Sequence, residues 1–329
     1  MSGNTPINRL MTPDEAAGLI REGRFLMLAG DEAALRQLPA GNWMGGTMPY
    51  FMEDTGGVSS RERLFVTELP VTAGAPQLRF YDVAGLDQVC VDGPDNGYSL
   101  IIIPAFSAVH SLYARRAQAF EDMFIKPVAG WVAGCHLDDL GRATPQVVLG
   151  SGPHFDAERA VVMHVPLSDE AYARIDILNA MAQGGGDSLR FAETGFSASA
   201  CTVNGEPRNL AEYLLARGAD RRLPLVADYG GASVNVSIKA IDGEAGRVDF
   251  YAPVFEDVEY RLAAPVDFSV PPLEQGMEPA LWSCNCILNY AYWRLEGQRT
   301  GTPPGAMSFG EIAYLLLNQT QVCLRIGQG

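Results

Sequence analysis

The stretch YSLIIIPAF, residues 98–106, belongs to the longest apolar run of the chain, which reaches about residue 109 and is interrupted by Pro104. A continuous apolar run of this length is typical of a strand that is buried on both faces, since a half-buried strand would alternate apolar and polar residues. A helix that crosses a bilayer needs about 18 consecutive apolar residues. We therefore expect a buried strand here, and no membrane-spanning segment.

Composition and charge narrow the class of protein. The chain has 329 residues, of which 47% are hydrophobic and 19% charged, which suggests a globular protein of about two domains. The formal net charge of -15 disfavours binding to nucleic acids and to anionic membranes. The N-terminal residues lack the pattern of a signal peptide. We expect a cytoplasmic protein whose six cysteines are reduced.

The order of the expected elements indicates an α+β fold. Thr12, Pro13 and the acidic residues that follow predict the start of a helix. Further helices are expected at 111–124 and from about 284 to 296, whereas many strands follow one another directly. Three successive glycines within residues 184–200 suggest a domain boundary. The prediction is therefore two layered mixed-sheet domains with flanking helices, at residues 1–190 and 191–329.

Several segments resemble the FIST family in their order and spacing. They are GNWMGGTMPYFM (41–52), PVAGWVAGCHLDDLGRATPQVVLGSG (127–152), CTVNGEPRNLAEYLLARGA (201–219), GRVDFYAPVFEDVEYRL (246–262), SCNCILN (283–289) and FGEIAYLLLNQTQVCL (309–324). The resemblance implies paired FIST N-terminal and C-terminal domains, which occur in bacterial signal transduction. It also implies binding of small ligands, with amino acids proposed, and some members resemble haem-based gas sensors. The chain departs from the family pattern at Trp43 and at MPYF (48–51), and carries no fused output domain, so a signal would pass through a partner protein.

Cys284 and Cys286 allow three interpretations. In a strand they would face the same side, but a metal site needs about three or four ligands and no second cysteine pair lies nearby. If Ser283 caps a helix, both cysteines lie in its first turn, where the unpaired N–H groups favour a thiolate. Small buried residues that allow tight packing are the third interpretation.

The four histidines differ in context. His110 lies between the buried strand and a helix, and is the best candidate for a haem or ligand contact. His136 follows Cys135 in a turn with two aspartates, which could bind a metal but more often bond the local backbone. His164 is expected to be a satisfied core residue, and His154 to be exposed.

We therefore predict a sensor-type protein that binds a small ligand in a cleft between its two domains. Glu311, after Gly310, is expected to be either a buried ligand-binding carboxylate or an acid in the first turn of a helix. No phosphate loop, dinucleotide fingerprint or Gly-x-Ser-x-Gly elbow is present. The rival predictions are an acyl- or thiol-transfer enzyme with Cys284 or Cys286 as nucleophile and Glu311 or His136 as base, and a haem sensor that uses His110. The predicted ligand-binding residues are Trp43, Gly45, Thr47, Trp131, His136, Cys284 and Glu311.

Overall fold

The computed structural model describes residues 6–229, 232–272 and 278–329. The chain divides into two compact units. The first unit consists of Met1–Ile177, Pro271–Leu315 and Gln321–Gly329, and the second consists of Leu178–Val270 and Leu316–Thr320. Strands hold 43% of the residues and helices 14%, in several layered sheets. The predicted α+β fold class is confirmed.

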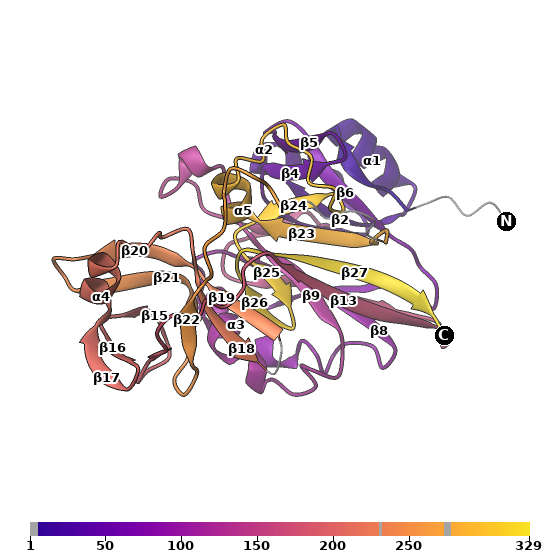
Figure 1. The fold of residues 1–329 in the computed structure, drawn as a ribbon. Helices are drawn as coiled ribbons and strands as arrows, with labels where there is room; N and C mark the ends of the chain where they lie inside the picture. Colours follow the sequence, from indigo (N-terminus) through magenta and orange to yellow (C-terminus); the bar gives the residue numbers. More distant parts are fainter. Residues whose placement is uncertain (1–5, 230–231, 273–277) are drawn as a thin grey trace. The chain divides into compact units, whose positions relative to one another are not determined.

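The units do not follow the single boundary predicted after residue 190. The chain leaves the first unit after Ile177 and returns to it at Pro271. The reason is strand pairing within the first unit, where β24 (Gly305–Ser308) lies antiparallel to β4 (Tyr50–Glu53), with Ala306 opposite Phe51. In Figure 1, β24 from the C-terminal part of the chain lies beside β4 from the N-terminal part.

Three six-stranded sheets lie mainly in the first unit, although residues 178–179, 316–317 and 320 of their strands belong to the second unit. One has the order β1 (Asn8–Met11), β6 (Leu64–Leu69), β2 (Phe25–Gly30), β3 (Trp43–Thr47), β10 (Val147–Leu149) and β11 (His154–Asp156). Another has the order β26 (Leu315–Leu317), β25 (Glu311–Ala313), β9 (Val128–Ala133), β8 (Gly97–Pro104), β12 (Ala160–Pro166) and β7 (Gln77–Tyr81). The other has the order β13 (Ala171–Asn179), β27 (Thr320–Gln328), β23 (Trp282–Cys286), β24, β4 and β5 (Gly56–Ser59).

The second unit holds two antiparallel sheets around a separate core of fifteen buried residues that includes Leu189, Leu214 and Tyr260. The larger sheet has the order β17 (Glu206–Asn209), β16 (Ala200–Val203), β14 (Leu189–Arg190), β22 (Tyr260–Leu262), β18 (Leu225–Tyr229) and β19 (Ala232–Val236). The smaller has the order β15 (Gly195–Ala198), β21 (Arg247–Val254) and β20 (Ile238–Asp242).

The helices are short. They are α1 (Pro13–Arg21), α2 (Glu32–Leu35), α3 (Ala108–Arg116), α4 (Leu210–Ala216) and α5 (Ile287–Tyr292), with 3-10 turns η1 (Leu86–Gln88), η2 (Ala117–Ala119) and η3 (Leu137–Asp139). α1 begins as predicted, because Thr12 and Glu15 cap each other's backbone N–H groups. Among the described residues, no helix has the length and apolar character needed to cross a membrane.

Two predicted helices differ from the structure. The helix expected at 111–124 begins earlier, where Ser107 caps α3, and its α-helical part ends at Arg116. The helix expected from about 284 is shorter still, because residues 282–286 form strand β23, which pairs with both β24 and β27. Two-sided pairing in the sheet outweighs the local helical preference of the sequence.

Strand β8 is fully buried along its length, as the apolar run predicts. It pairs in parallel with β9 and antiparallel with β12. A Cβ atom added to Gly130 of β9 would lie 1.8 Å from the Ile101 carbonyl oxygen, so only glycine fits at this register. A Cβ atom on Gly46 of β3 would lie 2.8 Å from side-chain atoms of both Ile102 and Trp131. The two glycines therefore set how closely the neighbouring backbones approach β8.

We expect Gly130→Ala to destabilise the protein by about 3 kcal/mol or more, because the added methyl group overlaps a strand carbonyl that cannot move freely. The measurement is urea unfolding followed by fluorescence. Gly152→Ala is the matched control, since a Cβ atom there meets no atom within 4 Å. Equal stability of the two variants would contradict this account of the β8–β9 contact.

Candidate functional site

Three residues from the C-terminal part of the chain form a buried polar cluster in the first unit. Cys284, Ser308 and Glu311 are all completely buried. The Ser308 hydroxyl lies 3.0 Å from the Gly310 carbonyl oxygen and 3.3 Å from Glu311 Oε1. The Cys284 thiol donates to the Gly130 carbonyl oxygen at 3.4 Å. Strand pairing, not sequence proximity, therefore brings the predicted Cys284 and Glu311 together.

The chemistry of Cys284 is not that of a thiolate. Burial raises the pKa of its thiol well above the ordinary value of 9.0, and the neighbouring Glu311 carboxyl raises this pKa further. The interpretation of Cys284 as a first-turn thiolate is wrong, because the residue lies inside strand β23. Cys286 ends that strand and precedes α5, without a side-chain capping bond. Glu311 lies in strand β25, so its interpretation as a helix acid is also wrong.

A second group of polar residues lies where β9 leaves the sheet. The Gly134 N–H donates to the Thr47 carbonyl at 2.8 Å, and the Thr47 hydroxyl donates to the Gly134 carbonyl at 2.7 Å. The Thr47 hydroxyl also accepts the Gln146 N–H at 3.0 Å. These bonds hold residues 134–141, GCHLDDLG, which we call the GCH turn, against the end of β3. Thr47 thus fixes the position of the turn, and His136 is one of the residues of that turn.

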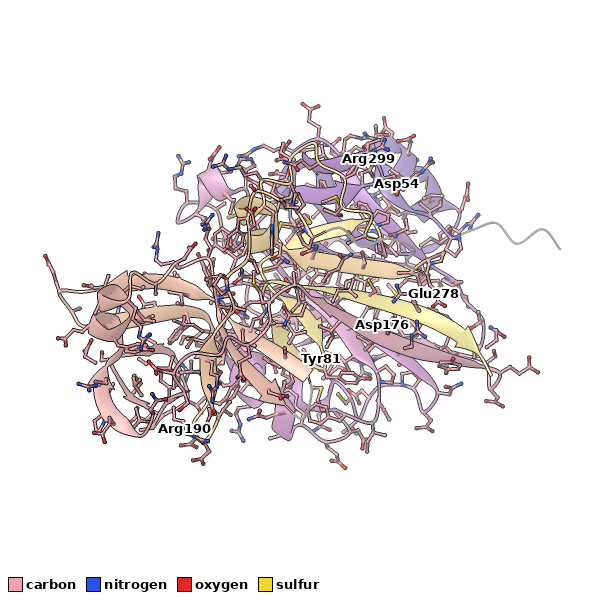
Figure 2. All side chains as sticks on the ribbon, viewed as in Figure 1. Asp54, Tyr81, Asp176, Arg190, Glu278 and Arg299 are labelled. Atoms are coloured by element: carbon pink, nitrogen blue, oxygen red, sulfur yellow. The ribbon has the colours of Figure 1, made fainter. Side chains whose placement is uncertain are left out.

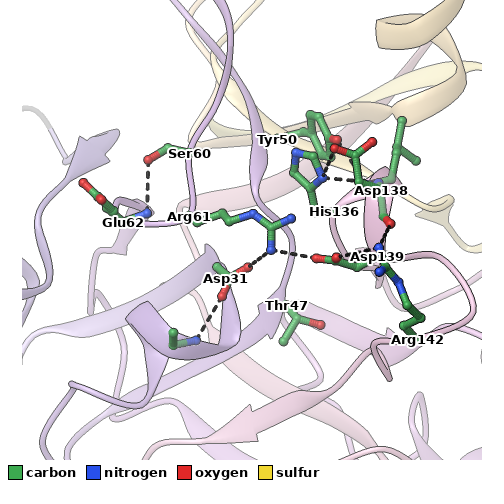
Figure 3. Close-up of polar contacts among 12 residues, drawn as sticks. Asp31, Thr47, Tyr50, Ser60, Arg61, Glu62, His136, Asp138, Asp139 and Arg142 are labelled. Carbon is green, nitrogen blue, oxygen red and sulfur yellow. Dashed lines mark hydrogen bonds and ion pairs between the residues drawn. The ribbon is translucent and has the colours of Figure 1, made fainter.

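The His136 ring stacks on Tyr50, with ring centroids 5.1 Å apart and planes 25° from parallel. Tyr290 of α5 meets the Tyr50 ring edge-on, at 5.3 Å. The Tyr50 hydroxyl accepts the Leu137 N–H at 3.1 Å, and burial raises the pKa of this hydroxyl. The Tyr50 side chain is thus fixed on both sides, and it orients the imidazole (Figure 3).

Charged side chains surround this aromatic stack. Arg61 lies 2.6 Å from Asp139 Oδ2 and 3.7 Å from Asp31 Oδ2 (Figure 3). The Arg61 guanidinium lowers the pKa of the Asp139 carboxyl by a charge-assisted hydrogen bond. The Asp138 carboxylate lies 3.5 Å from His136 Nδ1, and its side chain is 83% exposed. Asp138 is therefore the carboxylate of this group that is most available to a ligand. We call Asp31, Tyr50, Arg61, His136, Asp138 and Asp139 the His136 surface.

All seven predicted ligand-binding residues belong to the first unit, although Cys284 and Glu311 fall in the second of the predicted domains, residues 191–329. Of these residues, His136 belongs to the His136 surface, Thr47 is buried and bonds to Gly134 of the same turn, and Cys284 and Glu311 lie in the buried cluster. Trp131 lies opposite Glu311 in the β9–β25 pair. Trp43 belongs to the core instead, where its indole N–H donates to the Pro39 carbonyl at 2.9 Å. Gly45 lies on β3 opposite Leu28, where a Cβ atom would approach the Leu28 carbonyl to 3.0 Å.

His110, the predicted haem contact, lies in the first turn of α3. The Phe106 N–H approaches its Nδ1 at 3.3 Å, and Nε2 is shielded from solvent. Burial lowers the pKa of His110 to about 4. The ring is therefore neutral at pH 7, as iron ligation requires, but haem iron could reach Nε2 only if the surrounding side chains moved.

The aspartates of the GCH turn are not arranged around a common centre. Asp139 points to Arg61 and Arg142, whereas Asp138 lies beside His136. Within residues 6–229, 232–272 and 278–329, no group of three or more His, Cys, Asp or Glu side chains is placed to hold a metal ion. The metal interpretation of this turn therefore finds no support in the geometry.

The sequence could not identify Arg61 or Asp31 as site residues. Arg61 lies in a polar connection before β6, and Asp31 is the N-cap of α2. Each is a common residue in its local setting, and only the approach of β2, β3 and the GCH turn makes them neighbours. By contrast, His154 is exposed and His164 is buried with both ring nitrogens bonded, as predicted.

Residues 11–327 match a family pattern that spans both units. The chain belongs to DUF6976, a family of unknown function. A search of the curated proteins finds no match. The DUF6976 assignment does not bear on the FIST resemblance, which stays a prediction.

All six cysteines are buried. We expect iodoacetamide at pH 8 to modify fewer than one thiol per native chain within an hour, and all six after unfolding in urea. Intact-mass spectrometry provides the count. Rapid modification of Cys284 or Cys286 in the native protein would contradict the burial described here.

Stability should fall between pH 6.5 and pH 4. Burial lowers the pKa of both His110 and His164 from 6.5 to about 4. The unfolded chain therefore takes up protons first as the pH falls, and the stability present above pH 6.5 is progressively lost by about 3 kcal/mol per histidine. The check is urea unfolding at pH 7 and pH 4.5. Exposed His154→Gln should keep the same pH slope; a flat profile in the unmodified protein would contradict the prediction.

Proposed function

We propose that the protein binds a small amine-bearing molecule at the His136 surface, as the ligand-binding component of a bacterial signalling system. The observation that carries this proposal is the exposed Asp138 carboxylate beside the His136–Tyr50 stack. A carboxylate next to aromatic faces is a combination that recognises ammonium groups, through charge and through the ring quadrupole.

The charges of the surface favour the same ligand class. Asp31, Asp138 and Asp139 outnumber the Arg61 guanidinium, which is already engaged by two of them. The net charge of -15 on the whole chain would steer cations toward it and anions away. Amino acids, which the FIST resemblance implies, carry an ammonium group and are the first compounds to test. Transfer of the signal would need a partner protein in the same cytoplasmic compartment.

The thiol-enzyme alternative is weaker, because it needs a thiolate at a place where burial and Glu311 both favour the protonated thiol. The haem alternative predicts a Soret band on addition of haemin that is lost in His110→Ala. The His136 surface is favoured over both alternatives, since its Asp138 and Arg61 side chains are already exposed.

Isothermal titration with amino acids and simple amines tests the proposal. Asp138→Asn should raise the Kd at least about tenfold, the loss expected when a charge-assisted contact of about 1.4 kcal/mol or more is removed. Asp54→Asn, on the exposed turn between β4 and β5 of the same unit, is the matched control and should leave the Kd unchanged (Figure 2). The proposal fails if no amine binds, or if Asp138→Asn binds as tightly as the unmodified protein.

A further inference from the structure

A separate polar network lies on the sheet of β7, β8 and β12. Ser99 Oγ lies 2.7 Å from His164 Nδ1, and His164 Nε2 lies 2.8 Å from the Tyr81 hydroxyl. The Tyr81 hydroxyl donates to Asp92 Oδ2 at 2.8 Å, and Arg79 binds the same carboxylate oxygen at 2.5 Å. Figure 2 labels Tyr81. The network leads from a buried serine to a carboxylate that is one-third exposed.

Strand register makes this arrangement rigid. Ser99 of β8 is the direct partner of His164 of β12, and directly opposed residues share one face of the sheet. Ser99 is 2% exposed and His164 is 3% exposed. Neither side chain can leave its partner without a change in the sheet.

The hydrogen bonds have only one consistent direction. Tyr81 has a single hydroxyl proton, which it gives to Asp92, so His164 Nε2 must donate to the Tyr81 oxygen. The neutral imidazole then carries no proton on Nδ1, and the Ser99 hydroxyl donates to that nitrogen. Burial lowers the pKa of His164, Arg79 and Lys126 lower it further, and Asp92 raises it.

This order of groups is the one that activates a serine: a hydroxyl, a neutral base, and a third group that orients the base. We propose that Ser99 is a masked nucleophile, activated by His164, which attacks small esters or thioesters when the loop of residues 91–96 opens. This activity is independent of the ligand proposed for the His136 surface.

Gly93 of this loop lies close to both Ser99 and His164. A Cβ atom on Gly93 would lie 3.1 Å from Ser99 Oγ and 3.7 Å from His164 Nδ1, which is the separation expected of a reacting carbon. The Gly93 carbonyl accepts from Lys126 Nζ at 2.9 Å. The same ammonium group would stabilise the oxyanion of an acyl group that replaced this peptide.

Asn96 holds the loop in place. Its side-chain N–H group donates to the backbone carbonyls of Ser168 at 2.8 Å and of Ala171 at 3.1 Å, within the first unit. These bonds cross to a segment outside the network. Removing the Asn96 amide should therefore loosen the loop without touching Ser99 or His164.

The reaction balances with water as the only further reactant. Ser99 Oγ forms a bond to the acyl carbon, the carbon–oxygen or carbon–sulfur bond of the substrate breaks, and the serine proton passes through His164 to the leaving alcohol or thiol. Water then attacks the acyl-serine, giving one proton to His164, and the acid is released as Ser99 regains a proton.

The test uses a fluorophosphonate probe on the full chain, in which Ser99 Oγ bonds to phosphorus and fluoride leaves. Peptide mapping locates the adduct. We expect slow labelling of Ser99 in the unmodified protein and labelling at least tenfold faster in Asn96→Ala. Placed in the Asn96→Ala protein, His164→Gln should slow labelling about 100-fold, the scale of general-base assistance.

Ser99→Ala in the same protein is the site control and should abolish the adduct. A purely structural network would not produce a rate that depends on His164. The proposal is overturned if neither the unmodified protein nor Asn96→Ala gains an adduct on Ser99. It is equally overturned if His164→Gln, folded by circular dichroism, is labelled as fast as its parent.

Discussion

The burial of strand β8 on both faces is the constraint on which the first unit depends. Because both faces of β8 are buried, its backbone N–H and C=O groups find hydrogen-bond partners only in the neighbouring strands β9 and β12. Gly130 and Gly46 allow the required close approach. Both proposed sites depend on this arrangement, since the GCH turn follows β9 directly and Ser99 lies on β8 itself. A change in the packing of β8 would therefore displace both sites together.

The two proposed sites have opposite electrostatic environments. At the His136 surface, the Arg61 guanidinium lowers the pKa of the Asp139 carboxyl, and Asp138 beside His136 is exposed to an arriving cation. Around Ser99, burial lowers the pKa of His164 and keeps the imidazole neutral, so Nδ1 can accept the hydrogen bond of the Ser99 hydroxyl. Exposure suits recognition, whereas desolvation suits a base that must not be protonated in advance.

Buried side-chain amides explain why the segment FGEIAYLLLNQTQVCL, residues 309–324, is divided between the two units. Within the second unit, the Asn235 side-chain N–H group donates to the Asn318 carbonyl at 3.0 Å, and the Ser237 hydroxyl donates to Gln319 Oε1 at 2.7 Å. Both bonds are buried, and breaking either would leave a polar group without water. They bind residues 318 and 319 to the second unit, whereas Glu311 and the residues after 320 serve sheets of the first unit.

The sequence by itself determined the fold class, the buried strand at 98–106, the start of α1 at Thr12, and the different settings of His154 and His164. These features depend on local periodicity, capping and apolar content, which a single segment carries. Only the tertiary structure decided three other features. They are the strand at 282–286, the return of the chain to the first unit, and the contacts of Arg61 with Asp139 and of Ser99 with His164. Each depends on pairing between segments far apart in the chain, and pairing energy is a property of two segments that neither one shows alone.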